Sequence, residues 1–314
     1  MLLSIIVPVY NVHEYIRRCI DSLLKTDPEM EYEILLVNDG STDDSGNICD
    51  EYASRYDYIK VIHKSNGGLS DARNHGLQHA VGMYVMFVDS DDYVEENSIH
   101  SLYHEIAGGQ CDIYCSNYYS LTGSVRKDLQ YTPTDEVVCG QAFLKYQLEH
   151  GTMISTVVQN VYRREYLLKN QLLFKKGIYH EDEEWYPRVF LSADSVACVK
   201  TGYYVYCIRE NSIMQQKNLT KHIRDFIATM TDLMNRYESE IDGSLFCLLK
   251  DDWVSKYLAI YARGNFGSGT KDVVLPVKML RKGLVRRGTK IKVLIFAISR
   301  RLYCKLSRMK NARR

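Results

Sequence analysis

The first hundred residues alternate between near-continuous apolar runs and segments with helical spacing. The runs LLSIIVPVY and YEILLVND predict buried strands of a parallel sheet, and YIKVIH and MYVMFVD predict a third and a fourth strand. The segments between them place apolar residues three and four positions apart, which is typical of helices. One of these helices is expected to begin near Ser41 or Thr42. Strand–helix repeats of this kind predict an α/β fold with a mostly parallel sheet and helices on both faces.

The pattern changes in the second half of the chain. Residues 218–264 predict helices, because Phe226, Met230, Leu233, Met234 and Tyr237 follow helical spacing and a turn signal stands at Asp242-Gly243. We therefore expect three parts: an α/β domain over 1–215, a helical extension over 216–270 and a tail over 271–314.

Polar residues follow the predicted strands, at the edge of the sheet where ligands of such folds bind. Asn11 follows the first strand, Asp39 the second and Asp89 the fourth, and the segment NGGLSDARN follows the third with Arg73 near its end. Neither a dinucleotide-binding glycine pattern nor a GxxxxGK[ST] phosphate loop is present. A nucleotide site on this sheet must therefore work in another way.

The fourth strand runs directly into the acidic sequence DSDD. Asp89 and Asp91 stand two residues apart, so an extended chain directs both carboxylates to the same side. Hard oxygen ligands in this arrangement suit Mg²⁺ or Mn²⁺ with open positions for phosphate oxygens. We favour this metal–nucleotide site over a helix cap for Asp89 and Asp91, whereas for Asp92 the cap at the start of the following helix stays open.

Charge is divided unevenly along a chain whose formal net charge is only +1. Residues 271–314 hold 15 Lys and Arg and one acid, Asp272, a net charge of +14, whereas residues 1–270 carry −13. In the tail, seven apolar residues fall on one helical face: Ile291, Leu294, Ile295, Ile298, Leu302, Leu306 and Met309. A single basic amphipathic helix of this kind is expected to bind an anionic membrane surface. The alternative is a helix packed on the protein's own acidic body, and nucleic acid is not expected as a partner because no known binding module is present.

Other features bear on the compartment. No apolar stretch reaches the ~20 residues of a membrane-spanning helix, and the opening sequence lacks the basic start of a signal peptide. The nine cysteines are odd in number and irregularly spaced, which favours reduced thiols. We expect a cytoplasmic protein that is peripheral on the cytosolic face of the plasma membrane.

Four motifs in the first 117 residues, together with HEDEEW at 180–185, resemble the family 2 glycosyltransferases of GT-A fold. The motifs match in order and spacing and read VPVYN, VNDGSTDDS, NGGLSDARN and VDSDD. The resemblance implies inverting transfer of a sugar from a nucleotide-diphosphate donor, most often UDP-linked. It also implies roles for matching residues: Pro8 and Tyr10 at the base pocket, Asp39 on the uracil, Arg73 near base or diphosphate, Asp89 on the ribose and Asp91 on the metal.

The acidic segment HEDEEW is a second candidate for chemistry. Four successive carboxylates can be an ordinary acidic first turn of a helix. In the family, however, the general base is the Asp of an ED pair, which implies Asp182 here, with Glu181 orienting the base or the acceptor. His180 or His222 is a candidate for an extra metal ligand, and the alternative, more common for a lone His, is a structural role.

A further segment, YVYCIRENS, matches a pattern of related bacterial members in which Arg and Ser face the diphosphate. Arg209 and Ser212 are the matching residues, and an exposed loop arginine is the alternative. Residues 118–179 carry few signals and are expected to supply the acceptor pocket.

Two functions from different classes follow. The first is a metal-dependent inverting glycosyltransferase that acts on a glycan or lipid-linked acceptor for a surface polysaccharide. The second is a non-catalytic homologue that binds nucleotide-sugars as an assembly partner. The presence of Asp39, Asp89, Asp91 and Asp182 favours the enzyme. A sugar nucleotidyltransferase is disfavoured, since its Gly-rich triphosphate loop is absent.

Overall fold

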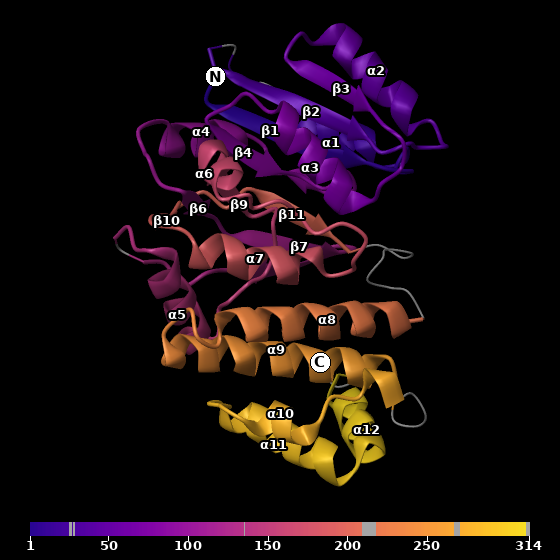
Figure 1. Ribbon diagram of the computed structural model, residues 1–314. Helices are drawn as coiled ribbons and strands as arrows, with labels where there is room; N and C mark the ends of the chain where they lie inside the picture. The colour runs from indigo at the N-terminus through magenta and orange to yellow at the C-terminus, as the bar shows by residue number, and fades with distance from the viewer. Residues whose placement is uncertain (25–26, 28, 135, 209–217, 267–270, 312–314) are drawn as a thin grey trace. The chain divides into compact units, whose positions relative to one another are not determined.

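The computed structural model describes residues 1–24, 27, 29–134, 136–208, 218–266 and 271–311. The chain divides into two compact units, shown in Figure 1. The first unit comprises residues 1–147, 152–177 and 185–209, and the second comprises 148–151, 178–184 and 210–314. The domain boundaries expected after residues 215 and 270 stay a prediction.

The first unit is built on a mixed sheet with the strand order β10-β6-β9-β4-β1-β2-β3 among the described residues. Its strands are β1 Leu3–Val9, β2 Tyr32–Asn38, β3 Ile59–His63, β4 Tyr84–Phe87, β6 Ile113–Cys115, β9 Asn160–Arg163 and β10 Val196–Cys198. Among these described strands, β9 alone runs antiparallel to its neighbours, β4 and β6. The four strands expected in the first hundred residues are all confirmed, and β1, β2 and β4 are buried along their whole length.

Helices connect these strands and cover the sheet. They are α1 Ile16–Ser22, α2 Ser45–Arg55, α3 Leu69–His79, α4 Ser98–Ala107, α5 Gly140–His150, α6 Arg164–Lys169 and α7 Glu181–Leu191. Helix α3 lies closely on β1 because it has a glycine at the contact: a Cβ on Gly76 would stand 2.3 Å from Cγ2 of Ile6. This close approach places the start of α3 beside the ends of the central strands.

Helix α2 begins at Ser45, so the start expected near Ser41 or Thr42 is wrong. The polar residues before it lie in the connection from β2 to α2 and form hydrogen bonds with Asn11, just after β1. Asn11 Oδ1 accepts the Thr42 N–H at 2.8 Å, and Ser41 Oγ accepts the Asn11 N–H at 3.2 Å. Residues that resemble a helix cap in sequence therefore join two strand ends here.

A smaller sheet has the order β5-β11-β7-β8 in the described part of the chain. Its strands are β5 Tyr93–Val94, β7 Tyr118–Thr122, β8 Val125–Leu129 and β11 Tyr204–Cys207. Strand β5 follows DSDD directly, and the next helix, α4, begins only at Ser98. The helix-cap alternative for Asp92 is therefore wrong.

The second unit is helical, as expected. Its main helices are α8 Thr220–Tyr237 and α9 Gly243–Arg263, followed by a 3-10 turn Lys271–Val273, α10 Val277–Arg281, α11 Arg287–Ile298 and α12 Arg300–Asn311. Asp242 caps α9 by accepting the N–H groups of Ser244 and Leu245 at 3.0 and 3.1 Å. The apolar residues singled out in α8 are all buried.

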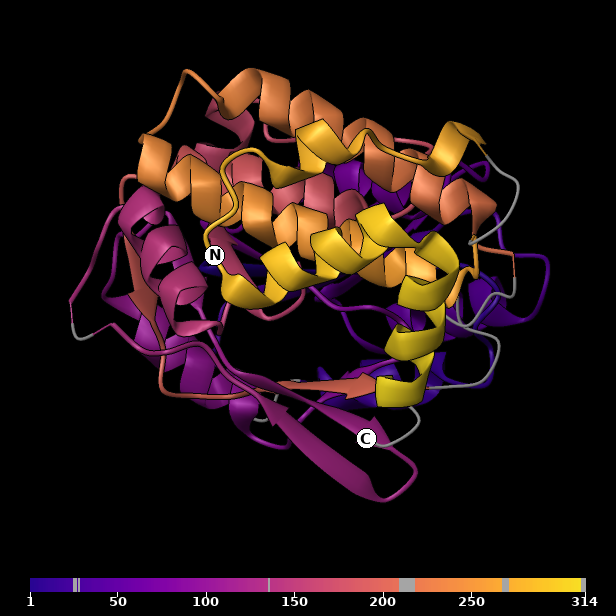
Figure 2. The same ribbon diagram turned by 90° about the horizontal axis from the view of Figure 1, so that it is seen from below.

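The tail forms two main helices, so the single amphipathic helix expected from its pattern is wrong. The chain is extended at Ser299, with φ −156° and ψ 112°, and Ser299 Oγ accepts the Leu302 N–H at 3.2 Å to cap α12. Figure 2 shows α11 and α12 meeting at an angle. Among the described residues, no helix has both the length and the apolar character needed to cross a bilayer.

Candidate active site

The ends of β1, β2 and β4 lie at one edge of the large sheet. The parallel register pairs Val9 with Asn38, and the Asp39 N–H donates to Val9 O at 2.9 Å. On the other side of β1, the Val88 N–H donates to Ile6 O at 3.0 Å. This edge therefore carries the residues named from the sequence: Pro8, buried within β1; Tyr10, 48% exposed; Asp39; and Asp89.

Asp39 holds the glycine turn before α3 against the end of β2. Its carboxylate accepts the N–H groups of Gly67 and Gly68 at 2.9 and 2.7 Å and also contacts Lys64 Nζ. Gly68 has φ +86°, which only glycine adopts readily. The uracil contact implied for Asp39 stays a prediction, and the structure gives this buried carboxylate a local role besides.

Arg73 supplies the positive charge beside the DSDD sequence. It projects from α3, is 3% exposed, and its Nη2 donates to Asp89 Oδ1 at 2.7 Å. Its guanidinium also lies 5.4 Å from the centroid of the Phe174 ring. A buried guanidinium paired with Asp89, which follows β4, is suited to a diphosphate, because Arg binds phosphate groups in bidentate fashion.

The remaining aspartates of the turn have different environments. Arg18 Nη2 donates to the main-chain oxygen of Asp91 at 2.8 Å, and the Asp91 side chain is partly exposed. Asp92 is buried and accepts the hydroxyl of Tyr204 at 2.5 Å and the N–H of Cys207 at 2.7 Å. Burial raises the pKa of Asp92 well above its usual range, and the charges of Asp89 and Asp91 add to this effect.

Asp92 thereby ties the acidic turn to strand β11. Sequence reasoning missed this role, since its partners lie more than a hundred residues further along the chain and no local pattern marks them. Arg209 and Ser212, the residues implied for the diphosphate, lie outside the described residues. The strand that leads into them, β11, ends at Cys207, where Asp92 holds it.

The carboxylates fit a divalent metal only as a partial ligand set. Within the described ranges, no group of three or more His, Cys, Asp or Glu side chains is arranged to hold a metal ion. Asp89 and Asp91 are hard oxygen donors, and Mg²⁺-type sites commonly use one or two carboxylates with substrate phosphates as further ligands. The residues present therefore fit a metal that arrives with, or is completed by, a diphosphate.

The second unit contains the other candidate group, at the start of α7. Asp182 is partly buried, and burial raises its pKa well above the usual range, with the neighbouring charges of Glu181 and Glu183 adding to the shift. Lys256 on α9 acts in the opposite direction. Its Nζ lies 2.7 Å from Glu183 Oε2 and 2.8 Å from Asp252 Oδ2, so the acidic turn is partly neutralised.

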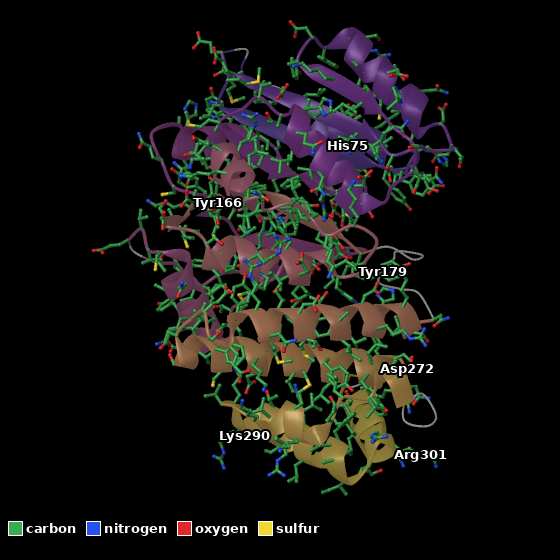
Figure 3. The ribbon with its side chains drawn as sticks, in the orientation of Figure 1. His75, Tyr166, Tyr179, Asp272, Lys290 and Arg301 are labelled. Carbon is green, nitrogen blue, oxygen red and sulfur yellow. The ribbon has the colours of Figure 1, made fainter. Side chains whose placement is uncertain are left out.

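The first two turns of α8 hold the segment that enters α7. The ring of Tyr179, labelled in Figure 3, stacks on His222 with centroids 4.2 Å apart, and the Tyr179 N–H donates to Asp225 Oδ2 at 2.8 Å. His222 Nδ1 lies 3.2 Å from His180 Nε2, a hydrogen bond between two imidazoles. Burial lowers the pKa of His180 to about 4, so both rings form a neutral pair near pH 7. The two histidines thus form a hydrogen bond with one another. They are 42 residues apart in sequence, so no local motif predicts this contact.

Comparison with known proteins identifies the family. Residues 4–170 match the sequence model described as glycosyl transferase family 2. The chain belongs to this family. Among curated proteins, the uncharacterised glycosyltransferase EpsJ of Bacillus subtilis is 38% identical over 218 residues, covering 68% of this chain and 63% of EpsJ. The poly(ribitol-phosphate) beta-glucosyltransferase of Bacillus spizizenii is 27% identical over 285 residues, 88% of this chain and 42% of that protein. The chain therefore spans less than two thirds of either relative.

The fold also has solved counterparts. The crystal structure of Staphylococcus aureus TarS residues 1–349 in complex with UDP-GlcNAc superposes with a TM-score of 0.71 at 19% identity. The match covers 99% of this family 2 chain and 92% of the TarS chain. The GT-A fold with added C-terminal helices, expected from the sequence, is confirmed.

Proposed function

We propose that the protein is a metal-dependent inverting glycosyltransferase. It moves a sugar from a nucleotide-diphosphate donor, UDP-linked, to an acceptor hydroxyl during synthesis of a surface polysaccharide or a lipid-linked glycan. The observation that carries the proposal is the Arg73–Asp89 ion pair beside Asp91 at the strand ends of a family 2 chain. It combines a cation for phosphate with carboxylates for a metal at one edge of the sheet.

The donor would lie along this edge. Pro8 and Tyr10 line the base pocket, Asp39 contacts the base, Asp89 the ribose and Arg73 the diphosphate. Arg209 and Ser212, which lie outside the described residues, would contact the diphosphate as well. A UDP-linked donor is supported by the TarS complex with UDP-GlcNAc, a protein of the same fold.

Asp91 would hold the Mn²⁺ or Mg²⁺, with Asp89 next to it. When bound, the ion neutralises negative charge that develops on the departing diphosphate. Arg73 contributes to the same neutralisation through its guanidinium. Asp92 does not take part directly, and it keeps the turn in place through Tyr204 and Cys207.

Asp182 is the proposed general base. It accepts the proton of the acceptor hydroxyl while that oxygen forms a bond to the anomeric carbon, and the bond from this carbon to the phosphate oxygen breaks. The nucleoside diphosphate leaves with the bonding electrons, and the configuration at the anomeric carbon inverts. A raised pKa suits this task, because a stronger base takes the proton more readily at neutral pH.

The acceptor is the least defined partner. Similarity to a poly(ribitol-phosphate) beta-glucosyltransferase over 88% of the chain supports a hydroxyl on a surface polymer or its lipid-linked precursor. We place the reaction on the cytosolic face of the membrane, where nucleotide-sugars are made.

A donor screen tests the proposal. UDP-, GDP- and dTDP-sugars are incubated with the protein and Mn²⁺, Mg²⁺ or a chelator, and nucleoside diphosphate release is measured. We expect slow release from a UDP-sugar that requires metal and accelerates with an acceptor. Tight donor binding without release under any condition would favour the assembly partner instead.

A further inference from the structure

Helices α11 and α12 bury one face within the second unit, and the aromatic residues of this face pack on α9. Val293, Phe296, Tyr303 and Cys304 are buried. The Phe296 ring lies 4.9 Å from that of Tyr261 on α9 and 5.8 Å from that of Tyr303, centroid to centroid. The two helices are therefore held by packing, and their remaining faces have a defined orientation.

The apolar residues recognised in the sequence lie elsewhere on the same helices and are mostly exposed. Six of them have exposed fractions between 44% and 72%: Ile291, Leu294, Ile298, Leu302, Leu306 and Met309. On each helix they recur three or four positions apart, so each set shares one side. Sustained exposure of large apolar side chains at helical spacing is typical of a surface that binds something.

Positive charges accompany this apolar surface. Among the exposed cations of α10–α12 that make no ion pair within the part of the chain that the structure describes are Arg281, Arg287, Lys290, Arg300, Arg301 and Lys305. Figure 3 labels Lys290 on α11 and Arg301 on α12. By contrast, Lys282 pairs with Glu238 at 2.7 Å, so acidic partners exist in this unit but leave these six unpaired.

A cavity of about 340 Å³ combines both features. It is lined by Arg281 and Lys290 together with Leu284, Ile291 and Leu294. A lining of two cations and three aliphatic side chains suits an amphiphile with an anionic head and a hydrocarbon chain.

We propose that α10, α11 and α12 form a docking surface for a bilayer that contains anionic phospholipid. The cations attract the lipid head groups, and the exposed leucines and isoleucines enter the boundary between head groups and acyl chains. A second copy of the chain would bring two strongly basic surfaces together, and such like-charge contact is unfavourable. This proposal is independent of the sugar donor.

Vesicle co-sedimentation with the full chain tests the apolar part. The double variant Leu294→Glu/Leu302→Glu places acids on the exposed surface, and Val81→Glu/Val125→Glu is the matched control, since both valines are exposed in the first unit. We expect wild type and control to bind vesicles of phosphatidylcholine with phosphatidylglycerol, and the leucine variant to bind at least about tenfold more weakly. Equal binding by all three proteins would overturn the proposal.

The charge part is tested in the same assay. Arg281→Gln/Lys290→Gln should weaken binding about tenfold, whereas Lys127→Gln/Lys169→Gln, which changes two exposed cations of the first unit, should not. Vesicles of phosphatidylcholine alone should bind poorly, and added salt should weaken but not abolish binding to anionic vesicles. Self-association would replace the proposal if wild type is a dimer in light scattering and does not bind vesicles, while the leucine variant is a monomer. Retained donor binding or circular dichroism shows that each variant is folded.

Discussion

At the residue scale, three aspartates of one turn differ because their neighbours differ. Asp89 Oδ1 accepts a hydrogen bond from Arg73. Asp91 is partly exposed, and its main-chain oxygen accepts a hydrogen bond from Arg18. Asp92 is buried and binds Tyr204 of β11. These surroundings make Asp92 an anchor of the turn, whereas the side chains of Asp89 and Asp91 are both partly exposed.

Asp91→Asn should abolish most of the metal-dependent turnover. The amide lacks the negative charge that a divalent ion requires, so donor affinity in the presence of Mn²⁺ should fall together with the rate. Isothermal titration with donor, with and without metal, measures this change. Asp57→Asn, an exposed aspartate in the turn after α2, is the matched control. Unchanged metal-dependent affinity in Asp91→Asn would remove Asp91 as a ligand.

The pH dependence of turnover should reveal Asp182. The base works when deprotonated, so kcat should fall as the pH is lowered through its pKa, which burial raises above the ~3.9 of a free Asp. Glu183→Gln removes one of the negative charges that raise this pKa, while Lys256 keeps its contact with Asp252. The acidic limb of the kcat profile should therefore move to lower pH in this variant. A limb at the same pH in both proteins would assign it to another group.

At the element scale, α8 positions the start of α7 through the Tyr179–His222 stack and the His180–His222 hydrogen bond. His180 has φ +61°, a left-handed backbone conformation that non-glycine residues seldom adopt and that these contacts help to hold. The same helix therefore fixes the direction from which the chain enters the acidic turn.

His222→Phe should lower kcat with little change in donor affinity. The phenyl ring retains the stacking on Tyr179 but loses the hydrogen bond to His180, so the acidic turn is less precisely placed. His222→Asn, whose amide can take the place of Nδ1, should restore part of kcat, and exposed His104→Phe should have no effect. Steady-state kinetics at varied donor concentration separates kcat from KM. If His222→Phe and His222→Asn lose stability to the same extent and neither loses kcat, the role of His222 is limited to folding.

The sequence predicts the elements of this fold better than their connections. Strands β1, β2 and β4 are apolar runs that are buried along their whole length, so the order of apolar residues predicts them directly, whereas β3 is only partly buried. Contacts that join distant segments leave no local trace: Asp92 reaches β11, and His180 reaches His222. The break at Ser299 is likewise missed because the apolar spacing continues across it, although a serine cap signals a new helix.

At the scale of the whole molecule, the basic tail, residues 271–314, does not form a unit of its own. The tail belongs to the second unit and packs its aromatic face on α9. Removing residues 271–314 would therefore expose the rings of Tyr257 and Tyr261, and point variants test the membrane role more cleanly than truncation.

Phe296→Ala should destabilise the protein by about 3–5 kcal/mol, since the ring is 1% exposed and its loss leaves a cavity. Ile298→Ala on the same helix should change stability by no more than about 0.5 kcal/mol, because Ile298 is 72% exposed. Chemical denaturation followed by circular dichroism compares the two. Similar losses for both variants would show that α11 packs in another orientation.

We propose that this family 2 chain transfers sugar from a nucleotide-sugar with Asp182 as the base. The most direct measurement is nucleoside diphosphate release from a UDP-sugar, with Mn²⁺ and an acceptor, by wild type and by Asp182→Asn, alongside donor affinity. We expect equal donor affinity and a rate about 10²–10⁴-fold lower in the variant. Release at the wild-type rate by Asp182→Asn would show that Asp182 is not the base.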